Sequence, residues 1–324
     1  MRNKRVCITG TIYSLFLYLL ISSEQQIKDT FYFFGDPIPY HVQKNFKYYY
    51  SFKRGLKLWE RRILKIYLRL FSRFKWNFLN EAEIYAQDHF WFSPGIIGNR
   101  DYTLLEDAPL IASRFYGTEI YTKQKTSNKK LSSFFYGPLF QKYMGISNQC
   151  TKIILTKPDN APYLKGKELS LSSIDLLWDK CNEQKRKLIL SIFNVTQTDI
   201  DLLKKKSKIF FSQPFFNDKF MSKEEHINLF KSVLADYDSQ EVILKVHPRD
   251  LIEYENYFPK ILIFKKPIPM QLFNLLGIKF TSAITFFSTA ALSFPYDIEI
   301  DWRGTKVHKN LLNHFGDLKL SDYR

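Results

Sequence analysis

The 324 residues include 45% hydrophobic and 17% aromatic side chains with only 12 glycines and 13 prolines, which excludes a disordered or collagen-like chain and favours about two domains. Cys7, Cys150 and Cys181 form no CxxC pair, so neither a disulfide framework nor a zinc knuckle is supported, and a reducing compartment fits best. Basic residues outnumber acidic ones by 48 to 32, and this net charge of +16 predicts a polyanionic partner: nucleic acid, an anionic membrane or a phosphorylated substrate.

The chain begins with basic residues and an apolar stretch to about Ser22, a pattern that secretory signals share. Thr9-Gly10-Thr11 interrupts the stretch after a β-rich run, and apolar residues then resume at helical spacing from Leu15. This pattern predicts strand, tight turn and helix, the opening of a doubly wound α/β domain whose first turn faces a ligand. Because no A-x-A-like cleavage site follows, a signal or membrane anchor is the less favoured alternative, and no transmembrane helix is expected.

The segment from Lys44 to Lys75 carries eleven basic residues against one acid, Glu60, and so holds +10 of the net charge. Apolar residues recur at three- and four-residue spacing from Leu56 onward, which predicts a basic amphipathic helix. Its apolar stripe fits the outer face of an α/β sheet, and the helix also fits an anionic bilayer surface. Nucleic-acid binding is not expected, because no recognition motif accompanies the charge. The basic residues are Lys44, Lys47, Lys53, Arg54, Lys57, Arg61, Arg62, Lys65, Arg69, Arg73 and Lys75.

Strands alternate with helices in both halves of the chain, which predicts parallel sheets. The composition turns polar from about Lys123 to Lys130 and again from Lys157 to Ser173. We therefore expect the interdomain connection near residues 155 to 185 and divide the chain into domains 1–165 and 166–324. The fold class is therefore α/β, with two Rossmann-like domains facing each other across a cleft. Strands are expected at 30–34, 82–86, 102–105, 208–212, 242–246, 261–264 and 283–287, and helices at 222–235 and 289–294.

Polar residues follow four of these strands, at the carboxyl ends where parallel α/β sheets bind ligands. Singly, each group also fits an ordinary turn, strand exit or helix cap; together they supply a general base, a general acid and a phosphate cradle. Glu224-Glu225-His226 lies within an expected helix and is interpreted as surface. The four groups are Glu106-Asp107; Gln213-Pro214 with Asp218 shortly after; His247-Pro248-Arg249; and Ser288-Thr289 at a helix start.

Several common catalytic motifs are missing from the sequence. GxGxxG, Walker A, HExxH and G-x-S-x-G do not occur, which disfavours dehydrogenases, P-loop NTPases, zinc proteases and α/β-hydrolases. The pairs Asp199/Asp201 and Asp236/Asp238 would suit a metal-dependent sugar transferase. Neither pair follows a convincing strand, so both are interpreted as surface and no metal site is expected.

Two segments, Lys245-Val-His-Pro-Arg-Asp250 and Thr285-Phe-Phe-Ser-Thr-Ala-Ala-Leu292, resemble the lipooligosaccharide sialyltransferases of glycosyltransferase family 52 and the related polysialyltransferases. These families share a GT-B architecture, a His-Pro motif, a Ser/Thr motif and an acidic motif in the N-terminal half. Tyr102-Thr-Leu-Leu-Glu-Asp-Ala-Pro109 is similar to the acidic motif, although Ala108 stands where glycine is expected, and Tyr85-Ala-Gln-Asp-His89 is also similar. The resemblance covers about residues 80 to 110 and 205 to 295.

The resemblance implies an acceptor-side N-terminal domain, a nucleotide-sugar-binding C-terminal domain and a set of roles. His247 would bind and protonate the departing phosphate of CMP-sialic acid. The base would be Asp218 by likeness to family 52, and Glu106 or Asp107 by likeness to the polysialyltransferases. The implied reaction is inverting, of the α-2,3 type, and requires neither metal nor cofactor. Ser288 and Thr289 would hold the same phosphate, and the further donor-binding candidates are Gln213, Pro214, Pro248, Arg249, Gly10 and Thr11.

From this resemblance we expect CMP-sialic acid and a galactose-terminated glycan of lipooligosaccharide or capsule as substrates. We also expect a cytoplasmic protein in peripheral contact with the anionic inner face of the bacterial cytoplasmic membrane, and a homodimer is compatible with the sequence. One alternative is another nucleotide-sugar transferase of the same fold. The other is a non-catalytic glycan- or membrane-binding homologue, which Ala108 favours and the retention of His247 and Ser288 disfavours.

Overall fold

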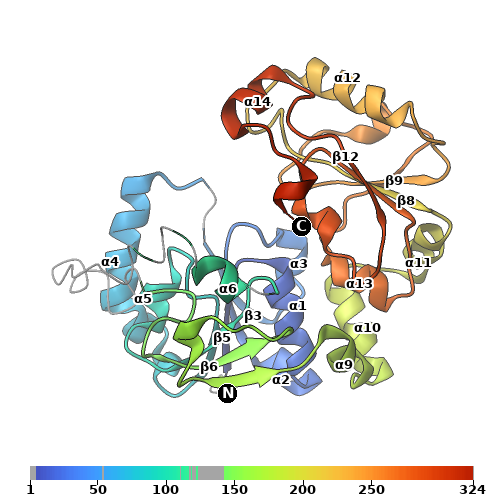
Figure 1. Ribbon diagram of the computed structural model, residues 1–324. Helices are drawn as coiled ribbons and strands as arrows, with labels where there is room; N and C mark the ends of the chain where they lie inside the picture. The colour runs from blue at the N-terminus through green and yellow to red at the C-terminus, as the bar shows by residue number, and fades with distance from the viewer. Residues whose placement is uncertain are drawn as a thin grey trace. The chain divides into compact units, whose positions relative to one another are not determined.

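The computed structural model describes residues 5–52, 55–109, 111–116, 118, 122 and 142–323. It divides into two compact units, Met1–Ile192 and Phe193–Arg324 (Figure 1). Each unit is a parallel sheet with helices packed on it, which confirms the α/β class. The compact units divide C-terminal to the expected 165/166 boundary, because the polar stretch after residue 157 contains strand β7 (Glu168–Leu171), which pairs with β6 (Cys150–Leu155) in the first sheet.

The first unit contains a seven-stranded parallel sheet in the order β3-β2-β1-β4-β5-β6-β7. The strand order reverses between β1 and β4, which makes that position the switch point where doubly wound sheets bind ligands. The expected strands are confirmed as β2, β4 and β5, whereas β3, β6 and β7 were not expected. The other bounds are β1 (Arg5–Thr9), β2 (Phe31–Phe34), β3 (Tyr48–Ser51), β4 (Glu83–Ala86) and β5 (Tyr102–Leu105).

Helices cover both faces of this sheet. The strand–turn–helix opening is confirmed, because Thr11 caps α1 by accepting the backbone N–H of Ser14 at 3.3 Å. Tyr18 of α1 packs edge-on against Tyr32 and Tyr85 on one face, while α4 and α5 contribute to the core on the other. The helices are α1 (Ile12–Ile21), α2 (Glu24–Asp29), α3 (Tyr40–Gln43), α4 (Leu58–Lys75), α5 (Ser93–Ile97), α6 (Ile111–Tyr116), α9 (Ile174–Asp179) and α10 (Glu183–Ile192).

The expected basic helix is confirmed as α4, which begins at Leu58 and ends at Lys75. Lys53 and Arg54, which belong to the same basic segment of the sequence, lie outside the described residues. Within the described ranges, no helix is both long and apolar enough to cross a membrane. All three cysteines are buried free thiols.

The second unit contains a five-stranded parallel sheet in the order β10-β9-β8-β11-β12, with its switch point between β8 and β11. Four of its strands and helix α12 were expected, and β12 was not. The expected helix at 289–294 is a shorter 3-10 helix, η4 (Thr289–Leu292), since Pro295 disfavours helical geometry at the residue before it. The elements are β8 (Lys208–Phe211), β9 (Val242–Lys245), β10 (Leu262–Phe264), β11 (Ser282–Thr285), β12 (Glu299–Trp302), α11 (Gln197–Lys204), α12 (Lys223–Leu234), α13 (Met270–Leu275) and α14 (Lys309–Phe315).

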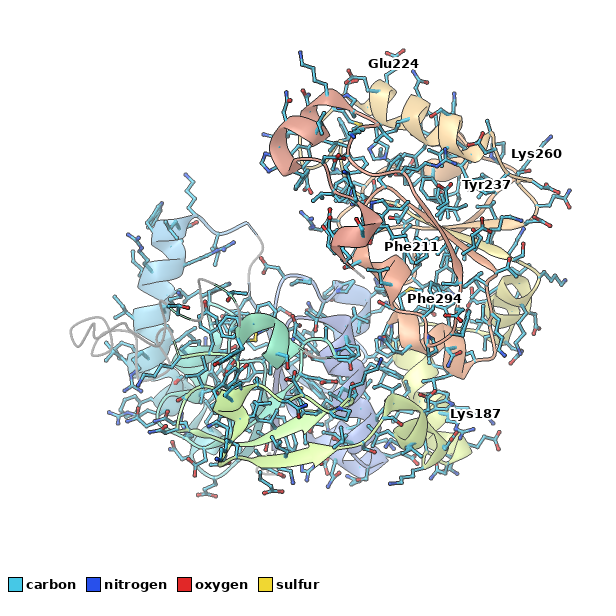
Figure 2. The ribbon with its side chains drawn as sticks, in the orientation of Figure 1. Lys187, Phe211, Glu224, Tyr237, Lys260 and Phe294 are labelled. Atoms are coloured by element: carbon cyan, nitrogen blue, oxygen red, sulfur yellow. The ribbon has the colours of Figure 1, made fainter. Side chains whose placement is uncertain are left out.

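The helix α12 packs one face on the second sheet. Phe230 of α12 lies with its ring centroid 4.9 Å from that of Phe210 in β8. His226, one turn earlier on the same face, is 0% exposed, so its interpretation as a surface residue is wrong. Figure 2 shows Glu224 directed away from the sheet, as expected for the solvent side of the helix. The four-residue spacing places His226 and Phe230 on one face and Glu224 on another.

Candidate active site

The candidate residues of the second unit follow β8, β9 and β11. Because β8 lies between β9 and β11 in the sheet, the loops after the three strands adjoin. Gln213, which precedes Pro214 after β8, accepts the backbone N–H of Phe287 after β11 at 3.0 Å. Ser212 Oγ accepts the backbone N–H of His247 after β9 at 2.9 Å. The structure thus brings the loops that contain Gln213-Pro214, His247-Pro248-Arg249 and Ser288-Thr289 to one edge of the sheet, at its switch point.

His247 is half-buried and has a defined tautomer. Its Nδ1 accepts the backbone N–H of Arg249 at 3.1 Å, so a neutral ring carries its proton on Nε2. Burial, with the positive charges of Arg249 and Lys245 nearby, lowers the pKa of His247 from 6.5 to about 4. At neutral pH the ring is therefore an uncharged donor. No described residue bonds to Nε2, so this N–H is left for a bound group.

A buried hydrogen-bond chain holds together the loops after β8 and β9. Asp250 Oδ2 accepts the hydroxyls of Ser212, at 2.7 Å, and Tyr254, at 2.6 Å. His226 Nε2 lies 2.7 Å from the Tyr254 oxygen, and its Nδ1 accepts the backbone N–H of Phe216 at 3.2 Å. Burial raises the pKa of Asp250 and lowers the pKa of His226 to about 4. Because the chain ends on the backbone N–H of His247 and on that of Phe216, it holds the backbone of both loops in place.

Asp218 and Arg249 form an ion pair at the same edge of the sheet. Arg249 Nη1 lies 2.8 Å from Asp218 Oδ1, and the two side chains are 65% and 30% exposed, respectively. A turn after β8 holds Asp218, whose backbone N–H donates to the Pro214 carbonyl at 2.8 Å. Such an exposed pair contributes little to stability. The ion pair does hold the guanidinium of Arg249, which is two residues after His247 in the chain, in a defined position.

Ser288 caps the short helix η4. Its Oγ accepts the backbone N–H of Ala290 at 3.3 Å, while its own N–H donates to Thr285 Oγ1 at 2.9 Å. The hydroxyl proton of Ser288 is left to donate, and Thr289 is exposed. Since η4 has only four residues, its dipole is small, and the two hydroxyls are the groups here that could bind an anion.

In the first unit, Gln87 occupies the switch point between β1 and β4. Its Oε1 accepts the N–H groups of Gly10, at 2.7 Å, and Thr11, at 3.2 Å, and its Nε2 donates to Asp107 Oδ1. A Cβ on Gly10 would lie 2.2 Å from the ring of Phe90, so only glycine fits the turn. The amides expected to face a ligand are therefore occupied by a side chain of the same unit, which ties the turn to the acidic motif.

Glu106 follows β5 and is only 1% exposed. Its Oε1 accepts the Tyr13 hydroxyl at 2.6 Å, the Thr156 backbone N–H at 3.0 Å and the Thr156 hydroxyl. Its Oε2 is buried without a hydrogen-bond partner among the described residues. Burial raises the pKa of Glu106, since the charged form loses its hydration. The carboxyl group thus belongs to the interior of the unit rather than to its surface.

Asp107 is the accessible member of the acidic pair. Its side chain is 27% exposed, with Oδ2 4.0 Å from His89 Nε2. Ala108, which stands where the resembling families have glycine, does not take a positive φ. An alanine therefore fits the turn without backbone strain, and its presence carries no argument against an intact acidic motif.

Most of the residues that hold the candidate site residues in place were not predicted from the sequence. Gln87 lies in the segment Tyr85–His89, which had been noticed only for its resemblance. Asp250 lies at the end of the resembling segment Lys245–Asp250 but was given no role, and Tyr254 gave no signal, because a buried polar chain has no periodicity of its own. Within the described parts of the chain, no three metal-ligating side chains lie close enough together to hold a metal ion.

Comparison with known proteins places these observations in context. A model of glycosyltransferase family 52 matches residues 117–311, which include Asp218, His247 and Ser288 but not the acidic pair. A protein of Haemophilus influenzae described as uncharacterized is 30% identical over 322 residues, covering 98% of this chain and 99% of the relative.

Solved structures of similar fold include bacterial sialyltransferases. The 2,6-sialyltransferase of Photobacterium sp. JT-ISH-224, in complex with the donor product CMP and the acceptor lactose, has a TM-score of 0.57 at 13% identity, covering 92% of this chain and 70% of that one. The galactoside α-2,3-sialyltransferase of Photobacterium phosphoreum has a TM-score of 0.52 at 11% identity and covers 99% of both chains. The GT-B domain of the Photobacterium damselae enzyme has a TM-score of 0.52 at 13% identity, covering 92% and 89%. The fold is GT-B, and the chain belongs to glycosyltransferase family 52.

Proposed function

We propose that the protein is an inverting sialyltransferase that moves sialic acid from CMP-sialic acid to a terminal galactoside of lipooligosaccharide or capsule. The observation that carries this proposal is the cluster at the switch point of the second sheet, with the free Nε2–H of His247, the guanidinium of Arg249 and the hydroxyl of Ser288. Guanidinium and neutral donors of this kind match a nucleotide phosphate. Membership of family 52 supports the transferase chemistry.

His247 is assigned to the leaving group. As the bond between the sialic acid anomeric carbon and the phosphate oxygen breaks, its electron pair moves to the phosphate. The growing negative charge beside Nε2 raises the pKa of His247, so the ring can take up a proton from solvent at Nδ1, releasing the Arg249 N–H, and donate its Nε2 proton to the departing phosphate of CMP. Arg249 and Ser288 stabilise the same charge.

Asp107 is assigned as the base that removes the proton of the acceptor hydroxyl as the new bond forms. Of the two acids after β5, only Asp107 has accessible surface, whereas Glu106 is enclosed by Tyr13 and Thr156. In the second unit Asp218 is engaged with Arg249, and we assign it to holding that guanidinium. Glu106 is accordingly a positioning residue.

The purified protein should transfer sialic acid from CMP-sialic acid to lactose, giving a product that a linkage-specific sialidase identifies as α-2,3. Transfer from a UDP-hexose and not from CMP-sialic acid would instead assign another donor. Binding of CMP without transfer to any galactoside in an acceptor panel would favour a non-catalytic homologue. A chelator should leave the rate unchanged, since no step of the proposed mechanism requires a metal.

We further propose that the reaction takes place at the inner face of the cytoplasmic membrane, where nucleotide donors and lipid-linked acceptors meet. Three buried free thiols are compatible with a reducing compartment. The high net charge supports peripheral contact with anionic lipid, and no nucleic-acid partner is proposed.

A further inference from the structure

The helix α4 presents a broad apolar face to solvent. Seven of its large apolar side chains are 42% to 68% exposed. At about 100° per residue, all but Leu58 fall within one stripe about 120° wide. Soluble surfaces rarely expose a contiguous apolar patch of this kind without a partner. The exposed side chains, termed the α4 face, are Leu58, Trp59, Ile63, Tyr67, Leu70, Phe71 and Phe74.

A different and narrower side of α4 attaches the helix to its own unit. Leu68 is 1% exposed, and a Cβ on Gly95 of α5 would lie 2.5 Å from the Leu68 Cβ, so the helices are in close contact. Ser72 Oγ donates to the Gly95 carbonyl at 3.0 Å. The interpretation in which the apolar stripe packs on the sheet is therefore wrong, and the α4 face needs another partner.

The charge of α4 indicates which kind of partner the α4 face contacts. The helix contains six basic residues and one acid, a net charge of +5. Arg62, Arg69 and Arg73 lie along one border of the α4 face, and the Arg73 guanidinium is 4.7 Å from the ring centroid of Phe74. A second copy using the same face would set +5 against +5. An anionic bilayer matches both the apolar stripe and its basic border.

We infer that the α4 face docks on an anionic bilayer, with Trp59, Ile63 and Phe74 in the boundary between headgroups and acyl chains and Arg62 and Arg73 at the lipid phosphates. Aromatic and aliphatic side chains bordered by arginine are the combination that interfacial helices use. The docking stands on the geometry of α4 alone. Its purpose, delivery of the enzyme to lipid-linked acceptors, rests on the proposed function.

Sedimentation of the full-length protein with vesicles tests the apolar contribution. Wild-type protein should bind vesicles of phosphatidylglycerol and phosphatidylcholine and bind pure phosphatidylcholine far more weakly. The double substitution Ile63→Ser and Phe74→Ser should weaken binding at least tenfold. Leu176→Ser on α9, which alters a residue 56% exposed outside the α4 face, is the matched control and should bind as wild type.

The substitutions Arg62→Gln and Arg73→Gln test the contribution of charge. Each should weaken vesicle binding about fivefold, because a basic residue near an anionic surface contributes about 1 kcal/mol to the binding free energy. The loss should shrink as salt is added, because the surface potential decays within about 8 Å at physiological ionic strength. Lys187→Gln is the control, since Lys187 points outward from α10 (Figure 2) and is 72% exposed. It should have no effect.

Insertion is tested by tryptophan quenching with lipids brominated in the acyl chains. Quenching in wild type that Trp59→Phe abolishes would support docking. Absence of vesicle binding, or binding unchanged in the Ile63→Ser, Phe74→Ser protein, would overturn it. If that double variant instead dissociates a homodimer, or lowers the melting temperature while the wild type ignores vesicles, another part of the protein covers the face and docking is again overturned.

Transfer to soluble lactose, measured without vesicles, separates the two proposals. The double variant Ile63→Ser, Phe74→Ser should retain wild-type transfer because α4 contributes no residue to the candidate site. Wild-type protein that binds vesicles but shows no transfer would contradict the proposed function and leave docking intact.

Discussion

The protonation state of His247 depends on burial and on the nearby positive charges of Arg249 and Lys245. A histidine that accepts a hydrogen bond at Nδ1 and lies near Arg249 and Lys245 is neutral in the free protein. A phosphate bound at Nε2 reverses the sign of the local field and favours the protonated ring. In the proposed mechanism, His247 is thus a neutral hydrogen-bond donor before the nucleotide binds and a general acid afterwards.

This behaviour predicts the titration of His247 in solution. The imidazole NMR signals, assigned by comparison with His247→Ala, should titrate with a midpoint near pH 4 in the free protein. Addition of saturating CMP should move the midpoint upward toward neutral pH. A midpoint near the ordinary value of 6.5 without CMP would contradict the contribution of burial and of Arg249.

Removing the imidazole should slow turnover more than it weakens donor binding. His247→Ala is expected to lower kcat by roughly 10²- to 10⁴-fold, the range for loss of a general acid. The KM for CMP-sialic acid should change less, since Arg249 and Ser288 still contact the phosphate in the proposed complex. Near-wild-type turnover in this variant would remove His247 from the mechanism.

The three carboxylates are expected to respond differently to neutralisation. Asp107→Asn should lose nearly all transfer. Asp218→Asn should keep most of kcat and raise the KM for the donor, because Arg249 loses its partner. Glu106→Gln, which can keep the hydrogen bond from Tyr13, should have the mildest effect. Initial rates over a range of donor concentrations measure all three, and inactive Asp218→Asn with active Asp107→Asn would move the base to the second unit.

At the scale of elements, α12 contributes a buried histidine whose ionisation opposes folding. The pKa of His226 falls from 6.5 to about 4 in the folded protein, so the unfolded chain binds a proton first as the pH is lowered. The stability is therefore fully present above pH 6.5 and is lost progressively between 6.5 and 4. By pH 5 the loss amounts to about 2 kcal/mol.

Urea unfolding at pH 7 and pH 5 measures this loss. His226→Gln should be less stable than wild type at pH 7, since Tyr254 and the Phe216 amide lose their partner, yet its stability should change less between the two pH values. Tyr254→Phe is the control, because it interrupts the same chain without removing the titrating group and should keep the pH dependence. An equal pH dependence in His226→Gln and wild type would mean that His226 titrates normally.

In the molecule as a whole, both sheets have a switch point in their strand order, but the residues at the two switch points make different contacts. Each switch point is spanned by a glutamine, Gln87 in the first unit and Gln213 in the second. In the first unit, Gln87 accepts the backbone N–H groups of Gly10 and Thr11. In the second unit, Gln213 accepts the backbone N–H of Phe287 and leaves the polar side chains after β9 and β11 accessible. This difference supports the proposal that the nucleotide binds to the second unit.

Amide hydrogen exchange with saturating CMP tests the assignment. Protection should increase at residues 212–218, 246–250 and 286–290, which follow β8, β9 and β11. Amides of Gly10 and Thr11 should be unchanged, because Gln87 already binds them. Protection confined to the first unit would reverse the assignment of donor and acceptor sides.

The sequence alone determined the alternation of strands and helices, the strand ends that bear Glu106, Gln213, His247 and Ser288, and the basic amphipathic character of α4. These features are local, since apolar periodicity and turn residues act within a few positions of one another. Strands β7 and β12 were not predicted because they lie at the edges of their sheets, where their residues are exposed or half-buried and partly polar.

Tertiary structure decided what depends on contacts between distant segments. Whether the apolar stripe of α4 packs inward or faces solvent is invisible in its periodicity, because both placements require the same spacing. The enclosure of Glu106 by Tyr13 and Thr156 and the occupation of the Gly10 turn by Gln87 likewise arise only when separate strands meet in one sheet. Burial and hydrogen bonding, which set these properties, belong to the folded surroundings of a residue and not to its place in the chain.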